Sequence, residues 1–96
     1  MAGKQKARAE GIIGAIPMDE IKEALLNEYR RRIIRYRMVD EAMKKKYGVT
    51  FSDFESLNIV KEQGFSWQVE SDAMEWEHAI EGVRCAEQKL GDIEQA

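Results

Sequence analysis

Apolar and aromatic side chains recur at three- and four-residue intervals from Ile21 to Tyr47, and this spacing restricts the segment to a helix. The intervals are 4, 4, 4, 3, 3, 4 and 4, which keeps the side chains along one face at 3.6 residues per turn. A regular helix of this extent would be roughly 45 Å long at 1.5 Å per residue. The apolar stripe consists of Ile21, Leu25, Tyr29, Ile33, Tyr36, Val39, Met43 and Tyr47.

The sequence also marks where this helix begins and ends. Pro17 precedes Asp19 and Glu20, and acidic side chains in a first turn suit the positive end of the helix dipole. Lys44–Lys46 lie in the last turn, where cations are favoured, and Gly48 is a natural left-handed stop. We therefore expect one long helix from about residue 18 to residue 47.

A short connecting helix is predicted directly after Gly48. Thr50 is placed as its N-cap, with Asp53 three residues later and with Val49 and Phe54 positioned as a hydrophobic staple. We expect this helix to extend to about Glu62 and to be ended by Gly64. Its predicted apolar edge is Phe51, Phe54, Leu57 and Val60.

A second long helix follows, with Ser66 or Ser71 as its candidate cap and acidic side chains along its flanks. Together the elements predict an all-α fold: an antiparallel hairpin of two long amphipathic helices joined by a short capped helix. We assign residues 18–96 to one helical-hairpin domain and residues 1–17 to an arm that is flexible or becomes ordered on binding. The second stripe consists of Val69, Ala73, Trp76, Ile80, Val83, Ala86, Leu90 and Ile93.

Length and composition set further limits. A chain of 96 residues forms one domain at most, and its core is thin enough that a second copy would add stability, so we expect a homo-oligomer of coiled-coil character. Cys85 is the only cysteine, which fits a reducing compartment. The start of the chain is not a signal peptide, and no run reaches the roughly 20 apolar residues of a membrane span. These features predict a cytoplasmic protein with no membrane contact.

Charge divides the chain into two unlike halves. Residues 1–48 hold twelve Lys/Arg and seven Asp/Glu, a net charge of +5, and residues 49–96 hold three and eleven, a net charge of −8. A basic helical arm joined to an acidic one can fold back on itself or offer either arm to a partner of opposite charge. The charge pattern therefore predicts that the function of this chain is to bind another molecule.

The residues offer little for catalysis. His78 and Cys85 both fall on the side of the second helix opposite Trp76, with no oxyanion site predicted beside them. Glu75 and His78 have the Glu-x-x-His spacing of di-iron bundles, but His78 would face away from the bundle interior. No Gly-rich phosphate loop is present. We predict a protein that is not an enzyme and that uses no cofactor or metal.

A run of arginines on the first helix raises the alternative of nucleic-acid binding, because guanidinium groups bind phosphates and neighbouring tyrosines can stack on bases. The tyrosines belong to the packing stripe, however, and the pI near 5.2 is low for a DNA-binding protein. Pairing of this basic face with the acidic second long helix, either of the same hairpin or of a second copy, is the favoured interpretation. The candidate nucleic-acid contacts are Arg30, Arg31, Arg35 and Arg37.

Two segments together resemble a group of short helical prokaryotic proteins. The first is Lys46–Glu55, with the pattern KYG-hydrophobic-Ser/Thr-Phe-x-x-Phe-Glu, and the second is Asp72–Glu77, with the pattern Asp-x-x-Glu-Trp-Glu. Members of that group are often antitoxin components of toxin–antitoxin pairs. The similarity covers roughly residues 20–92, and the family pattern includes neither the arm nor the spacer Asn58–Phe65.

The resemblance implies an inhibitor that covers a small basic toxin, because ribonuclease-like toxins carry positive charge to hold RNA. The acidic half would then compete with RNA, with Trp67 as an aromatic anchor. A structural homo-oligomeric scaffold remains the alternative function. The predicted partner-binding residues are Trp67, Glu70, Asp72, Glu75 and Glu77, with Ile12, Ile13 and Ile16 of the arm adding apolar contacts.

Overall fold

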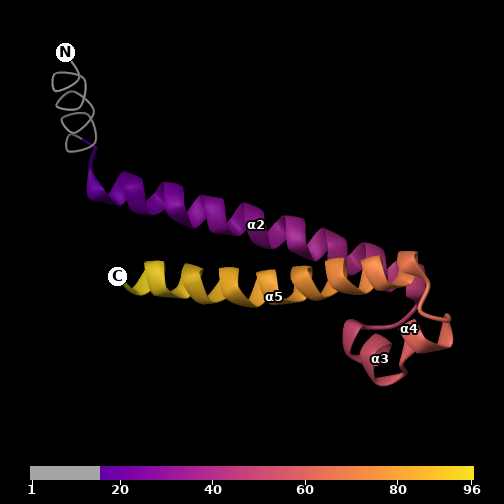
Figure 1. Cartoon of the computed structure of the whole chain (residues 1–96). Helices are drawn as coiled ribbons and strands as arrows, with labels where there is room; N and C mark the ends of the chain where they lie inside the picture. The colour runs from indigo at the N-terminus through magenta and orange to yellow at the C-terminus, as the bar shows by residue number, and fades with distance from the viewer. Residues whose placement is uncertain (1–15) are drawn as a thin grey trace, which may run out of the picture.

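The computed structural model describes residues 16–96, and in this part of the chain every regular element is a helix (Figure 1). The helices are α2 (Met18–Tyr47), α3 (Phe51–Ser56), α4 (Ile59–Glu62) and α5 (Trp67–Gln95). The prediction of an all-α fold with two long helices in a hairpin is confirmed. Most of the predicted arm, including Ile12 and Ile13, lies outside the described residues.

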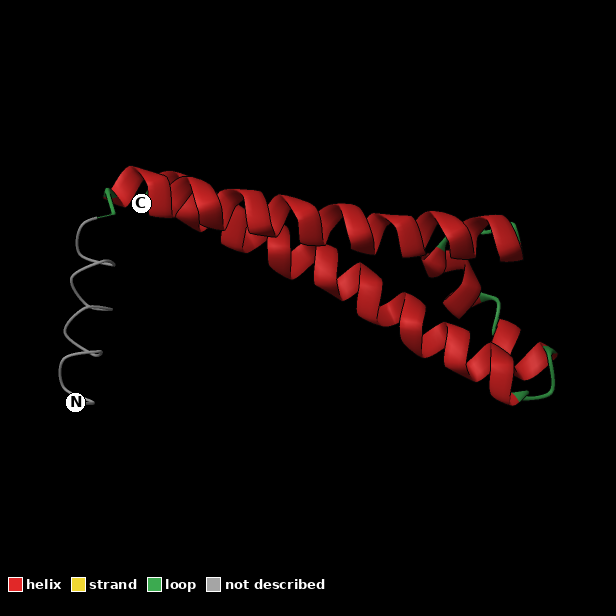
Figure 2. Ribbon diagram, turned by 90° about the horizontal axis from the view of Figure 1, so that it is seen from above, coloured by secondary structure: helices red, strands yellow, loops and turns green. Residues whose placement is uncertain are grey.

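The two long helices run antiparallel and cross obliquely, so that they overlap at one end and diverge at the other in the view from above (Figure 2). The short helices α3 and α4 lie at the end where residues 48–66 connect α2 to α5 (Figure 1), and we call this connection the hinge. At the opposite end Lys22 Nζ donates a hydrogen bond to the main-chain oxygen of Ala96 at 3.2 Å, which ties the start of α2 to the end of α5.

The predicted helix boundaries are confirmed by their local hydrogen bonds. Gly48 adopts a left-handed conformation (φ 71°), and its N–H donates to the carbonyl of Lys44 at 2.7 Å. The Thr50 hydroxyl accepts from the N–H of Asp53 at 3.2 Å and caps α3. Ser66, rather than Ser71, caps α5 by accepting from the N–H of Val69 at 3.3 Å.

The prediction of a single connecting helix is wrong, because the segment forms two short helices. Asn58 takes a left-handed conformation (φ 52°) between α3 and α4, which no continuous helix can contain. The turn directs Leu57 into solvent, so Leu57 is not part of the apolar edge as predicted. Phe51, Phe54 and Val60 do pack at the hinge.

The predicted stripe of α2 is also wrong at one position, because Leu25 is exposed and Leu26 is buried in its place. Successive intervals of four residues advance by 400°, so three of them in a row move a stripe about 120° around the helix. The buried residues of α2 are instead Leu26, Ile33 and Met43, which lie seven and ten positions apart, distances made up of three- and four-residue steps. This is the 3.5-residue period of packed antiparallel helices.

The core is concentrated at the hinge, around Trp76 of α5. Its side chain is fully buried (0% exposed) and packs with Phe54 of α3 and Met43 of α2. The rings of Phe51 and Tyr47 lie 5.4 and 6.0 Å from the Trp76 ring between centroids. Three helices are therefore joined through one indole.

The N–H group of the buried Trp76 indole has a hydrogen-bond acceptor. Trp76 Nε1 donates to Asp40 Oδ1 at 2.9 Å, and Asp40 Oδ2 lies 3.3 Å from Lys44 Nζ. A buried indole N–H without an acceptor would cost about 1–3 kcal/mol. Asp40 therefore allows a tryptophan at this position, and Lys44 balances the charge of Asp40.

Midway along the hairpin, α2 and α5 approach closely at Gly82. A Cβ atom built at Gly82 would lie 2.6 Å from the ring of Tyr36. The Tyr36 ring occupies this space and meets the edge of the His78 ring, with 5.7 Å between centroids. Gly82 is therefore required by packing, whereas Gly91 on the same helix has nothing within 4 Å of a built Cβ.

We predict opposite effects of alanine at these two glycines. Gly91→Ala should stabilise the fold by up to about 1 kcal/mol, because alanine is the better helix former. Gly82→Ala should cost about 1–2 kcal/mol despite the same propensity gain, since the Tyr36 ring must leave its site. Thermal unfolding followed by circular dichroism measures both.

A Gly82→Ala, Tyr36→Ala double variant is the control. Removing the ring should make Gly82→Ala neutral or stabilising in that background, so the two changes should be non-additive. Equal effects of Gly82→Ala and Gly91→Ala would show that Tyr36 does not restrict this position.

Candidate functional site

The side of α5 that faces away from α2 carries large apolar groups between acidic ones. Trp67, nine positions before Trp76, lies about half a turn around the helix from the buried indole, and Met74 lies about 160° from it. Trp67 is 82% exposed and Met74 is 71% exposed. We call this surface the α5 outer face; its members are Trp67, Glu70, Met74, Glu77 and Glu81.

Most acidic groups on and beside this face have no cation to neutralise them. Within residues 16–96, Glu70, Glu75 and Glu77 are exposed and no Lys or Arg nitrogen lies within 4.0 Å of them. Glu81 is paired with Arg84 of the next turn. Four of the five predicted contacts on the second helix, namely Trp67, Glu70, Glu75 and Glu77, are therefore exposed to a partner.

The fifth predicted contact, Asp72, is engaged inside the hairpin. Its Oδ2 accepts from Tyr47 Oη at 2.6 Å and from Lys46 Nζ at 2.5 Å, and its side chain is only 13% exposed. Asp72 thus fastens the start of α5 to the end of α2. It belongs to the hinge and not to the α5 outer face.

The charges at this hinge contact shift the pKa values of both partners. The bonds from Lys46 and Tyr47 lower the pKa of the Asp72 carboxyl below its usual value of 3.8. Burial, with the hydrogen bond to Asp72 second, raises the pKa of Tyr47 to about 12. Both shifts mean that a carboxylate and a neutral phenol are the forms that the folded hairpin stabilises.

The four candidate nucleic-acid contacts fall into two pairs. Arg37 lies 2.7 Å from Glu87 and Arg30 lies 3.9 Å from Glu94, so both reach across to α5. This agrees with the predicted pairing of basic and acidic helices. Arg31 and Arg35 instead contact Glu28 within α2, at 3.0 and 3.6 Å. They remain largely exposed.

The groups considered for catalysis and metal binding are separated or exposed. Cys85 is exposed beside Arg84 and Glu81. The prediction that His78 faces away from the interior of the hairpin is wrong, because its ring packs edge-on against Tyr36 of α2. In the segment from Ile16 to Ala96, no three His, Cys, Asp or Glu residues are grouped as a metal site, and Glu75 and His78 have no third ligand. An open hollow at the hinge, lined by Asp40, Phe51, Ile80 and neighbours, includes no histidine or cysteine.

Two further findings concern the predicted arm and the prediction about membrane spans. Ile16 is partly exposed next to Pro17, just before α2 begins. Among the helices of residues 16–96, none combines the length and the apolar character required to cross a bilayer.

Sequence reasoning missed the apolar groups on the outer sides of both helices. Met74 of α5 and Ile34 and Met38 of α2 are exposed, and none belongs to a predicted stripe. Their signal was present in the sequence: Ile34 and Met38 are four residues apart, and Met74 follows Trp67 by seven, the spacing of a second apolar strip.

Comparison of the chain with protein families, curated proteins and solved structures finds no match in any of the three. The resemblance to antitoxins therefore stays a prediction. By its fold and surface, the chain is a helical hairpin whose α5 outer face combines exposed carboxylates with exposed apolar side chains.

We predict that Tyr47→Phe lowers the free energy of unfolding by about 1–2 kcal/mol at neutral pH, because it removes the bond to the Asp72 carboxylate. The folded pKa of Tyr47 is raised, so its contribution is complete below pH 10 and is lost as pH rises toward about 12. The difference between wild type and variant should shrink across that range. Denaturant unfolding at neutral and alkaline pH measures it.

Tyr29→Phe is the matched control, since no hydrogen bond of the Tyr29 hydroxyl is found among the described residues while its ring still supports Arg32 at 5.0 Å. Its stability should stay within about 0.5 kcal/mol of wild type. A Tyr47→Phe variant as stable as Tyr29→Phe would contradict the role given to Asp72.

Proposed function

We propose that this chain is a non-catalytic binding protein that covers a small basic protein with the α5 outer face, as an antitoxin-type inhibitor would. The observation that carries the proposal is the combination of Trp67 and Met74, both more than two-thirds exposed, with Glu70 and Glu77, which have no cation partner in residues 16–96. A solvated helix does not need large apolar groups on its outer side. A binding face does.

The chemistry of this surface favours a cationic partner. Exposed carboxylates accelerate encounter with a basic protein and select against acidic ones. Tryptophan and methionine supply apolar area that is covered on contact, and tryptophan is a frequent anchor of binding energy. Such a partner could be a ribonuclease-like toxin, whose basic RNA-binding groove the helix would fill.

The rigidity of the hairpin supports the same role. Trp76 and the Asp72 contact fix the first turns of α5, where Trp67 and Glu70 lie. A face that is ordered before binding loses less conformational entropy when the complex forms. The described part of the chain is thus suited to binding through one long helix.

The test is native mass spectrometry of the tagged chain purified from its own source cells. We expect a complex with one small basic protein, which arrests growth when expressed alone and is neutralised by this chain. Glu70→Lys with Glu77→Lys should weaken that complex about tenfold or more and abolish neutralisation, because two attractive charges of the α5 outer face become repulsive.

Glu55→Lys with Glu62→Lys is the matched control, since both glutamates are exposed on the hinge helices and the net charge changes equally. This variant should bind and neutralise as wild type does. A chain recovered with no partner, or one whose neutralisation survives the Glu70 and Glu77 changes, would contradict the proposed function.

A further inference from the structure

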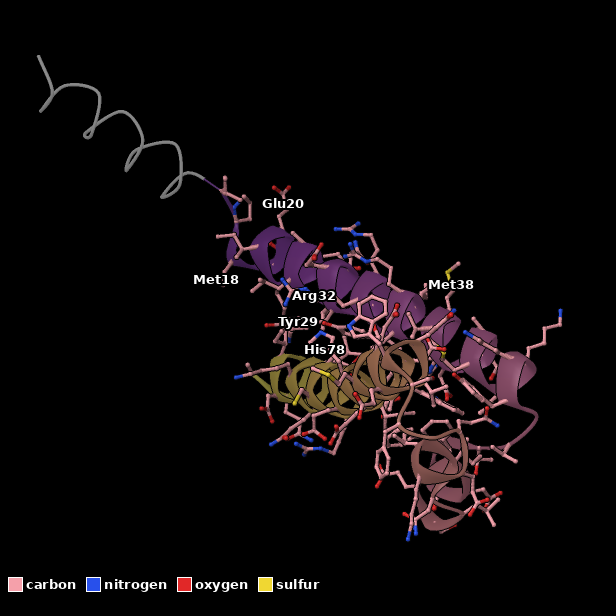
Figure 3. All side chains as sticks on the ribbon, turned by 45° about the vertical axis from the view of Figure 1, so that its right-hand side comes forward. Met18, Glu20, Tyr29, Arg32, Met38 and His78 are labelled. Carbon is pink, nitrogen blue, oxygen red and sulfur yellow. The ribbon has the colours of Figure 1, made fainter. Side chains whose placement is uncertain are left out.

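The side of α2 that faces away from α5 is a second unpartnered surface, and it is basic. Met38 lies five positions from both Ile33 and Met43, about 140° around the helix from each of these buried residues. Figure 3 shows Met38 on the side of α2 turned away from α5. Ile34, one turn earlier, is 58% exposed and Met38 is 65% exposed.

Uncompensated positive charge surrounds these two apolar groups. Arg31 and Arg35 flank Ile34 and Met38 at three- and four-residue intervals. The single carboxylate of Glu28 serves Arg31, Arg32 and Arg35 together, at 3.0, 3.1 and 3.6 Å. One negative charge against three positive ones leaves an excess on this side. We call Arg31, Ile34, Arg35 and Met38 the α2 outer face.

The two outer faces are complementary in both charge and apolar content. The α2 outer face sets Ile34 and Met38 among arginines, and the α5 outer face sets Trp67 and Met74 among glutamates. The α2 outer face, from Arg31 to Met38, is about two turns long, and the α5 outer face, from Trp67 to Glu81, is about four, so the first can lie along part of the second. Contact would cover four large apolar side chains and bring unpaired charges of opposite sign together.

From this complementarity we propose that a second copy of this chain is a ligand of the α5 outer face, bound through its α2 outer face. The contact joins unlike surfaces, and these surfaces lie on opposite edges of one hairpin. Each bound copy therefore leaves one basic and one acidic face free, and assembly continues beyond the dimer into chains or rings. Association should be salt-dependent, because exposed charges carry its selectivity.

This proposal does not rest on the basic partner proposed above, because the purified chain alone tests it. It does imply competition: the α2 outer face of a neighbouring copy would occupy the surface that a basic partner needs. Self-assembly and partner binding would then exclude one another.

The test is analytical ultracentrifugation of the wild-type chain from micromolar to millimolar concentration, at low and at high salt. We expect the average mass to rise past twice that of the chain at low salt and to fall at high salt. Arg31→Glu with Arg35→Glu, and separately Glu70→Lys with Glu77→Lys, should each weaken association at least about tenfold. Circular dichroism checks that both variants stay helical.

Matched controls change the same charge away from both outer faces. Lys61→Glu with Lys89→Glu corresponds to the arginine variant, and Glu55→Lys with Glu62→Lys corresponds to the glutamate variant; all four side chains are exposed. Both controls should associate as wild type does. Equal loss in the controls would show that net charge, and not these two faces, governs association.

Mixing the two face variants gives the sharpest outcome. The arginine variant has two acidic outer faces and the glutamate variant has two basic ones, so each repels itself. Mixed in equal amounts, each acidic face meets a basic one, and association should return to within about threefold of wild type. A mixture that stays monomeric, a wild type that is monomeric throughout, or a mass that stops at the dimer would overturn the proposal.

Discussion

The burial of Trp76 is the interaction on which the hairpin depends. Its indole packs against Met43 of α2 and Phe54 of α3 in one core, and Asp40 accepts the hydrogen bond of its single polar group. The remaining contacts between α2 and α5 involve smaller groups such as Ala79 and Ala86, or a bare glycine against Tyr36. Loss of a buried tryptophan costs about 3–5 kcal/mol, which is a large part of the stability of a small domain. The hinge therefore sets the geometry of both outer faces.

Local signals made most of the fold predictable. Helix stops and caps depend on one or two neighbouring residues, and Gly48 and Thr50 behave as the sequence indicated. The residues of α2 that face α5 were harder to predict, because the path of α5 decides which of them are buried. The contact residues of two helices packed side by side recur every 3.5 residues. Leu26, and not Leu25, is therefore the residue buried against α5. The break at Asn58 was missed because asparagine also occurs within helices.

The candidate site was predictable to the extent that it depends on helical spacing. Trp67, Glu70 and Glu77 fall on the outer side of α5 by periodicity alone. The role of Asp72 was not accessible in this way, because its partner Tyr47 is 25 residues away and the two meet only across the hinge. Pairing between distant segments depends on how the chain folds back. No pattern within one helix reports it.

The two tryptophans also give the molecule a pair of unlike optical reporters. Trp76 sits in a dry aromatic cluster with its indole N–H bound to a carboxylate, whereas Trp67 stands in water at the start of α5. Emission from the first should be blue-shifted and shielded from an aqueous quencher such as iodide, and emission from the second should be red-shifted and quenched. Unfolding of the hinge and coverage of the α5 outer face can thus be followed separately in one sample without any added label.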